Sequence, residues 1–232
     1  MSRFVGRERE LAALEPLVLE ARLLTLTGPG GIGKTRLAIE LANRLRGHFP
    51  QATWWVELAP LAASAFVEQA VARVLQVPED PDRPQLDVLV EALSLGPALL
   101  ILDNCEHLVD ACARLSEGLL QACPGLRIVA TSRQSLGVAG EYAWRVPSLD
   151  LPAAGAPHNV ATQTESVRLF LDRARAAQPA FVLGAESVAA LVRISRQVDG
   201  IPPCPRARHG APESIVARAA SGSARTARAR PG

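Results

Sequence analysis

Apolar residues along this chain form short continuous runs and longer periodic stretches, and these two kinds of stretch alternate. A short apolar run bounded by turn residues predicts a buried strand, whereas apolar residues three to four positions apart predict a helix with one buried face. The predicted strands span residues 23–27, 52–58, 98–102, 126–131 and 142–146. The predicted helices span residues 7–19, 35–46, 64–75 (with Ser64 as its cap), 86–95 and 108–123.

This alternation predicts an α/β fold, in which a mainly parallel sheet is covered by helices on both faces. The run ALLIL at residues 98–102 contains no polar position, as expected of a strand buried on both sides. The hydrophobic content of 48% is sufficient for a large core. We therefore expect a first, three-layer domain over residues 1–147.

The pattern changes after this domain. Residues 148–163 are rich in Pro, Ala and Gly and predict a linker. Helical periodicity returns at residues 165–177 and 185–198, so residues 164–202 predict the beginning of a separate helical domain.

The sequence GPGGIGKT after the first strand matches the phosphate-binding pattern G-x-x-x-x-G-K-[ST] at Gly28, Gly33, Lys34 and Thr35. Glycines let the backbone curl so that several N–H groups and a helix N-terminus face phosphate oxygens. Lys34 is the only lysine in a chain with 25 basic residues, and it is predicted to reach the β- and γ-phosphates, with Thr35 as a Mg²⁺ ligand. The alternative is a glycine-rich turn without a ligand.

Two further strand ends carry candidate polar groups. Asp103 follows the strand at residues 98–102 and is predicted to bind Mg²⁺ through water, although it could instead be a turn or capping residue. Asn104 occupies a position where a carboxylate could activate water; since an amide cannot accept the proton, hydrolysis is expected to be slow, with Glu106 as a candidate base. Arg133 ends RIVATSR and is a candidate γ-phosphate sensor or a surface arginine.

The overall charge and the cysteine content exclude few classes of function. The net charge is +2, but residues 201–232 carry six arginines and one glutamate, so this segment is +5 and the remainder −3. The four cysteines form no C-x-x-C pair and are interpreted as buried, reduced thiols. We find no signal peptide and no apolar run of about 20 residues, which predicts a cytoplasmic protein without a membrane partner.

Taken together, FVGRERE, TGPGGIGKTRLA, LLILDNCEHL, RIVATSR and ESVRLF…DGIP occur in the order seen in NB-ARC/STAND signalling ATPases. Over residues 3–202 the chain resembles the ATPase module of large bacterial transcriptional regulators with winged-helix or LuxR-type DNA-binding domains. The resemblance implies a P-loop NTPase three-layer sandwich that binds ATP or ADP with Mg²⁺ and acts as a nucleotide switch in signal transduction or transcriptional regulation. It also implies self-association or contact with other domains of a longer regulator.

The same resemblance implies roles for individual residues. Val5, Gly6 and Arg7 would line the adenine pocket, and Pro202 would pack on the adenine. Asp103 would bind Mg²⁺ and Arg133 would act as the sensor. The phosphates would be held by Gly28, Pro29, Gly30, Gly31, Ile32, Gly33, Lys34, Thr35 and Arg36.

The chain departs from this family after Pro202. Residues 203–232 lack helical periodicity and predict a disordered basic tail. If the codons for residues 202–209 are read in a frame shifted forward by one base, codon degeneracy permits the translation Pro-Ala-Leu-Glu-Leu-Ala, which resembles the helix expected in the family. A frameshift, a genuine basic tail and a diverged end are the three explanations. No DNA-binding module is visible in the sequence, and scattered arginines are weak support for nucleic-acid binding.

Three functions therefore stand in competition. The favoured one is a regulatory module that binds ATP or ADP and hydrolyses ATP slowly at most. A stand-alone P-loop enzyme such as a kinase would need a clear catalytic base, which the sequence does not offer beyond Glu106. The third is a truncated, non-functional fragment of a regulator.

Overall fold

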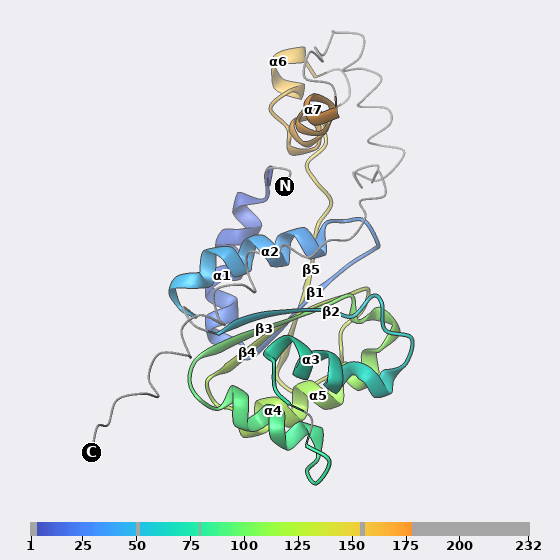
Figure 1. Cartoon of the computed structure of the whole chain (residues 1–232). Coiled ribbons are helices and arrows are strands. Elements are labelled where there is room, and N and C mark those ends of the chain that lie inside the picture. Colours follow the sequence, from blue (N-terminus) through green and yellow to red (C-terminus); the bar gives the residue numbers. More distant parts are fainter. Residues whose placement is uncertain (1–3, 50–51, 79, 154–155, 178–232) are drawn as a thin grey trace, which may run out of the picture.

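The computed structural model describes residues 4–49, 52–78, 80–153 and 156–177, and its centre is a five-stranded sheet (Figure 1). All neighbouring strands are parallel, and their order is β2-β3-β4-β1-β5. The strands are β1 (Leu23–Thr27), β2 (Thr53–Glu57), β3 (Ala98–Asp103), β4 (Leu126–Ser132) and β5 (Glu141–Arg145). The predicted α/β fold with a parallel sheet is thus confirmed.

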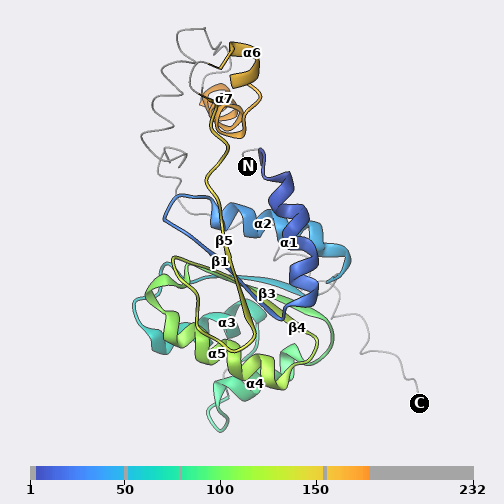
Figure 2. The same cartoon turned by 180° about the vertical axis from the view of Figure 1, so that it is seen from behind.

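Helices cover both faces of the sheet, as Figures 1 and 2 show from opposite sides. Helices α1 (Glu8–Glu20) and α2 (Lys34–Arg44), followed by the 3₁₀ turn η1 (Leu45–Gly47), cover one face. The other face is covered by α3 (Val67–Leu75), α4 (Gln85–Leu93), η3 (Cys105–His107) and α5 (Val109–Ala122), and the 3₁₀ turn η2 (Ser64–Phe66) lies against α3 and α5. These elements give the three layers expected from the sequence.

Alternate residues of the central strands enter the two cores. On β3, Leu99 and Ile101 pack with α1 and α2, whereas Leu100 and Leu102 pack with α3 to α5. Each of these four side chains is fully buried. The run ALLIL therefore has no polar position because neither face of β3 is open to water.

Two local predictions need correction. Ser64 does not cap a helix by its side chain; it begins the 3₁₀ turn η2, and α3 begins only at Val67. The helix after the glycine-rich loop ends at Arg44, because its last turn tightens into η1. Such 3₁₀ turns are common at helix termini and are not visible in apolar periodicity.

Beyond β5 the chain leaves the carboxyl edge of the sheet and reaches α6 (His158–Ala161) and α7 (Glu165–Ala177), which stand away from the three layers (Figure 1). Helix α7 spans the residues predicted for it. Helix α6 lies inside the segment predicted as a linker. The predicted helix at residues 185–198, Pro202 and the tail at residues 203–232 lie outside the described residues.

Three cysteines, Cys105, Cys112 and Cys123, are buried and free, as predicted, and Cys204 lies outside the described part of the chain. Among the helices that the structure describes, none combines the length and apolarity needed to cross a membrane.

Candidate functional site

The glycine-rich loop joins the carboxyl end of β1 to the first residue of α2. Gly28, Gly31 and Gly33 have φ angles of 143°, 81° and 98°, in the region that favours glycine. Ile32 is 2% exposed and anchors the loop in the core between the sheet and α2. Pro29, Gly30 and Gly31 are exposed. The loop is therefore held at its ends and open to solvent in the middle.

Lys34, the first residue of α2, folds back over this loop. Its Nζ donates hydrogen bonds to the Gly28 carbonyl at 2.9 Å and to the Pro29 carbonyl at 3.1 Å. Burial lowers the pKa of the Lys34 ammonium, whereas the negative charges of Glu106 and Asp103 act in the opposite direction. The ammonium thus lies within the curl of the loop, where the sequence predicts bound phosphates.

Asp103 ends β3 and meets the neighbouring residues through one carboxylate oxygen. Its Oδ1 accepts a hydrogen bond from the Thr35 hydroxyl at 2.8 Å and another from the Thr131 hydroxyl at 2.6 Å. Asp103 is 6% exposed, and this burial raises the pKa of its carboxyl, while the two hydroxyl bonds lower it. Thr131 belongs to the segment RIVATSR, from which the sequence analysis took only Arg133 as a candidate; its hydroxyl holds the predicted magnesium ligand in place.

Thr35 and Asp103 fit a magnesium ion by their chemistry. A hydroxyl and a carboxylate lie in contact beside the predicted phosphate site, and Mg²⁺ in such sites is held by few protein oxygens together with phosphates and water. In the described part of the chain, no group of three or more His, Cys, Asp or Glu side chains forms a site for a metal held by protein alone. A magnesium ion bound together with a nucleotide would be held by these two residues.

Asn104 adopts a left-handed conformation with φ 68° and ψ 51°, which asparagine tolerates better than most residues. Its N–H donates to the Thr131 hydroxyl at 2.9 Å. The residue after Asp103 therefore has a conformational role, and this role was hidden from sequence reasoning because it depends on the turn into η3.

The two candidates Glu106 and Arg133 contact each other. Arg133 Nε lies 3.3 Å from Glu106 Oε1, with the arginine side chain 68% exposed and the glutamate 19% exposed. Both charges also act on Lys34, Glu106 raising its pKa and Arg133 lowering it. The tertiary structure thus brings the candidate base, the candidate sensor and the loop lysine into one electrostatic group.

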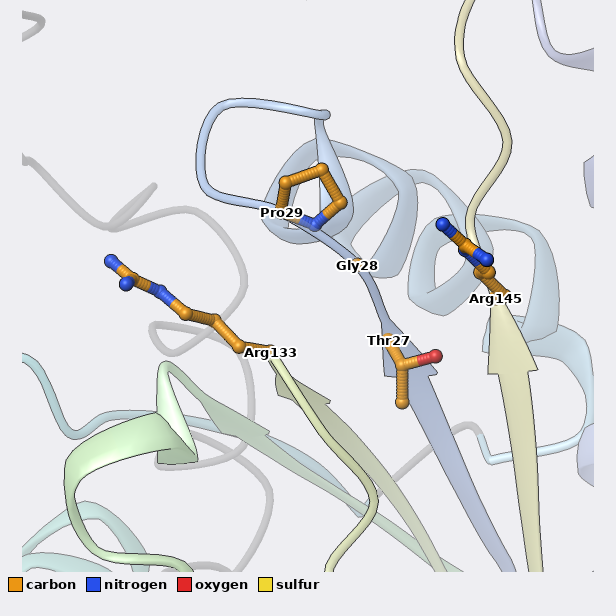
Figure 3. A pocket seen from close by; sticks show the side chains of 5 residues that line it. All are labelled: Thr27, Gly28, Pro29, Arg133 and Arg145. Atoms are coloured by element: carbon orange, nitrogen blue, oxygen red, sulfur yellow. The ribbon is translucent and has the colours of Figure 1, made fainter.

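An open cavity of about 230 Å³ lies beside the first residues of the loop (Figure 3). It is lined by Thr27, Gly28, Pro29, Arg133 and Arg145. Arg133 and Arg145 come from the ends of β4 and β5 and lie on opposite sides of the loop in Figure 3. Arg145 was missed from the sequence; its place at the end of the last predicted strand is the signal that could have identified it.

The segment predicted for the adenine pocket precedes α1. Val5 is half-buried, while Gly6 and Arg7 are buried. Arg7 Nη2 donates to the Ile32 carbonyl at 2.8 Å and to the Pro147 carbonyl at 3.0 Å, so this side chain is directed at the backbone of the glycine-rich loop and of the chain leaving β5. Arg36 is half-buried on the first turn of α2, and Pro202 lies outside the described residues. The roles of these residues stay predictions.

The parallel sheet, the glycine-rich loop entering α2 and the carboxylate at the end of β3 define a P-loop NTPase fold. Solved structures agree. The chain is similar to Cdc6p of Pyrobaculum aerophilum, with a TM-score of 0.52 at 19% identity over 75% of this chain and 50% of that one. It is also similar to the ORC2 protein of Aeropyrum pernix, with a TM-score of 0.52 at 14% identity over 96% of this chain and 70% of that one. At these identities the likeness shows the fold.

Residues 3–183 match the AAA ATPase domain family, and the chain belongs to this family. It is 37% identical over 202 residues to an uncharacterised protein of Mycobacterium tuberculosis, covering 87% of this chain and 49% of that protein. It is 42% identical over 189 residues to a protein of the same organism named as a candidate HTH-type transcriptional regulator. This match covers 82% of this chain and 20% of that protein. The chain thus spans about half the length of the first of these relatives and a fifth of the second.

Proposed function

We propose that this AAA ATPase domain is a regulatory module that binds ATP or ADP with Mg²⁺ and acts as a nucleotide switch in signal transduction or transcriptional regulation. One observation carries the proposal. The Lys34 ammonium lies in the curl of the loop, and the next residue, Thr35, donates its hydroxyl to Asp103 Oδ1 at 2.8 Å, so two oxygen groups of the kind that bind Mg²⁺ are in contact. Three groups from two elements are arranged for a phosphate chain and its metal ion.

Slow hydrolysis is part of the proposal. Asn104 cannot take a proton from water, and its conformation serves the turn after β3. Glu106 is the remaining candidate base, but its carboxylate is paired with Arg133 at 3.3 Å. While it is engaged in this ion pair, the carboxylate is not free to accept a proton from water. The site therefore favours holding a nucleotide over rapid turnover.

The regulatory part of the proposal rests on the relatives and on the motif order. One relative is named as a candidate HTH-type transcriptional regulator and is about five times the length matched here. The motif order resembles that of STAND signalling ATPases. We infer that nucleotide state is passed to other domains of a regulator, or to further copies of this chain.

Thermal melts with and without Mg²⁺–ADP test the nucleotide site. A ligand at 100 times its Kd stabilises the folded state by about 2.7 kcal/mol. For a domain of this size, about 2–4 °C per kcal/mol predicts a rise in Tm of roughly 5–11 °C. Lys34→Ala should abolish the rise, because it removes the charge at the centre of the loop.

Arg114→Ala is the matched control, since Arg114 is exposed on α5, on the face of the sheet opposite α2. It should melt with the same ADP-dependent rise as the native chain. An undiminished rise in Lys34→Ala would show that the loop is not the nucleotide site. Rapid, substrate-dependent phosphoryl transfer from ATP would instead favour a metabolic enzyme.

A further inference from the structure

The first residue of α7 contacts the segment that precedes α1. Glu165 Oε1 accepts a hydrogen bond from the backbone N–H of Arg7 at 2.5 Å, across 158 positions of sequence. The neighbouring Gly6 has φ 77°, and a Cβ on it would lie 2.8 Å from the same oxygen. Glycine at position 6 therefore allows both the turn and the close approach of the carboxylate.

On its other side, Arg7 holds the phosphate loop. Its Nη2 donates to the Ile32 carbonyl at 2.8 Å. The described peptide bonds are all trans, and in a trans peptide the C=O and N–H point in opposite directions. Because Arg7 fixes the Ile32 carbonyl, it also fixes the direction of the Gly33 N–H, one of the donors that a P-loop presents to phosphate.

Arg7 depends on outside support to stay in this position. It is 4% exposed and has a left-handed backbone with φ 64°, which is uncommon for a residue other than glycine. Burial lowers the pKa of its guanidinium, while the carboxylates of Glu10 and Glu165 act in the opposite direction. Glu10 Oε1 is 3.9 Å from Nη1, whereas Glu165 bonds directly to the backbone.

Charges on α7 also act on the helix that follows the loop. Burial lowers the pKa of the Arg36 guanidinium in the first turn of α2, the charge of Arg173 on α7 lowers it further, and that of Asp172 acts in the opposite direction. The first residue of α7 therefore contacts the residue that orients the loop, and charges farther along α7 act on the start of α2.

We infer that Glu165 is a positioning residue that couples α7 to the phosphate loop through Arg7. When α7 is docked, Glu165 holds Arg7, and Arg7 directs the Gly33 N–H for phosphate binding. Since coupling between two equilibria is reciprocal, bound ADP favours docked α7 to the same extent that docked α7 favours ADP. This coupling rests on the proposed nucleotide site and specifies how its state reaches the helices beyond the linker.

The test uses the whole 232-residue chain and measures the Kd for Mg²⁺–ADP by calorimetry, together with amide hydrogen exchange of residues 165–177. Glu165→Ala should weaken ADP binding about tenfold, within the usual range for coupled sites. It should also remove the ADP-dependent protection of α7. Glu165→Gln keeps an acceptor oxygen of the same reach, so it should restore most of both effects.

Two further variants complete the design. Gly6→Ala disturbs the same contact from the opposite side and should reproduce the Glu165→Ala result. Glu117→Ala, on an exposed position of α5, should bind ADP as the native chain does.

The outcomes separate this coupling from the nucleotide site itself. If ADP protects the loop amides but leaves exchange in α7 unchanged, or if Glu165→Ala binds ADP with native affinity, the coupling is refuted and the nucleotide site stands. If the native chain binds no ADP by either measurement, the proposed function is refuted and the coupling with it.

Discussion

Replacing Thr131 by valine tests whether this hydroxyl holds the carboxylate of the candidate site. Thr131 is 1% exposed on β4. Its Oγ1 donates to Asp103 Oδ1 at 2.6 Å and accepts the Asn104 N–H at 2.9 Å. Valine has nearly the same shape, so the substitution removes two hydrogen bonds and leaves little space unfilled.

The expected cost follows from these two contacts. Leaving a partly or fully buried polar group unpaired costs about 1–3 kcal/mol, with the larger values for charged groups. Asp103 would keep only the Thr35 hydroxyl as a side-chain donor, and the Asn104 N–H would lose its acceptor. We expect a loss of about 2–4 kcal/mol, which lowers Tm by roughly 5–15 °C for a domain of this size.

Thr25→Val is the matched control, on the adjacent strand β1. Thr25 is fully buried and pairs with Ala130, but its hydroxyl has no hydrogen-bond partner among the described residues. The same substitution should therefore leave stability unchanged or raise it by about 1 kcal/mol, since it removes an unpaired polar atom from the core.

Both variants are compared with the native chain by urea unfolding and by thermal melts without nucleotide. A Thr131→Val chain that loses no more stability than Thr25→Val would refute the reasoning, because it would mean that the two bonds to Thr131 contribute nothing beyond packing.

Three other substitutions test separate parts of the structure. Asp103→Asn should raise the Tm of the nucleotide-free chain by ~2–4 °C, since relieving a buried charge can gain on the order of 1 kcal/mol. It should also remove the Mg²⁺ dependence of ADP binding, and if titrations with and without Mg²⁺ still show that dependence, Asp103 is not a Mg²⁺ ligand. Arg133→Ala should weaken ATP binding at least tenfold and leave ADP binding unchanged, because it removes a charge-assisted hydrogen bond to the γ-phosphate. Equal losses of affinity for ATP and ADP would contradict a sensor role. Gly125→Ala should lower the free energy of unfolding in urea by about 1–3 kcal/mol, because its Cβ would lie 2.9 Å from the Gly96 carbonyl oxygen. The control Gly96→Ala places a Cβ with no atom within 4 Å and should leave stability unchanged, so equal stability of the two variants would show that the backbone at Gly125 shifts to make room.

Local patterns in the sequence were enough to identify most elements and the glycine-rich loop between β1 and α2. Helix α7 spans the predicted residues, and the bounds of the five strands lie within one residue of those predicted. These elements could be predicted because apolar spacing and turn residues act over a few neighbouring positions. Ser64 and η1 were not predicted correctly, since a 3₁₀ turn differs from an α-helix in hydrogen bonding more than in pattern.

The site residues were predictable where they follow a motif, and the contacts among them were not. Gly28, Lys34 and Thr35 lie within eight consecutive positions, so one pattern picks them out as candidates. Thr131 and Arg145 enter the site only because the strand order places β4 and β5 on either side of β1. Periodicity predicts strands, but it does not determine which strands become neighbours.

The sequence by itself determined a chain of alternating strands and helices with a glycine-rich loop, an apolar β3 ending in Asp103 and a helix at residues 165–177. Only the tertiary structure decided that Thr131 bonds to Asp103, that Glu106 pairs with Arg133, and that Glu165 meets Arg7 across 158 positions. The physical reason is range. Secondary structure follows from interactions between residues close in sequence, whereas these contacts depend on how whole elements pack around the sheet.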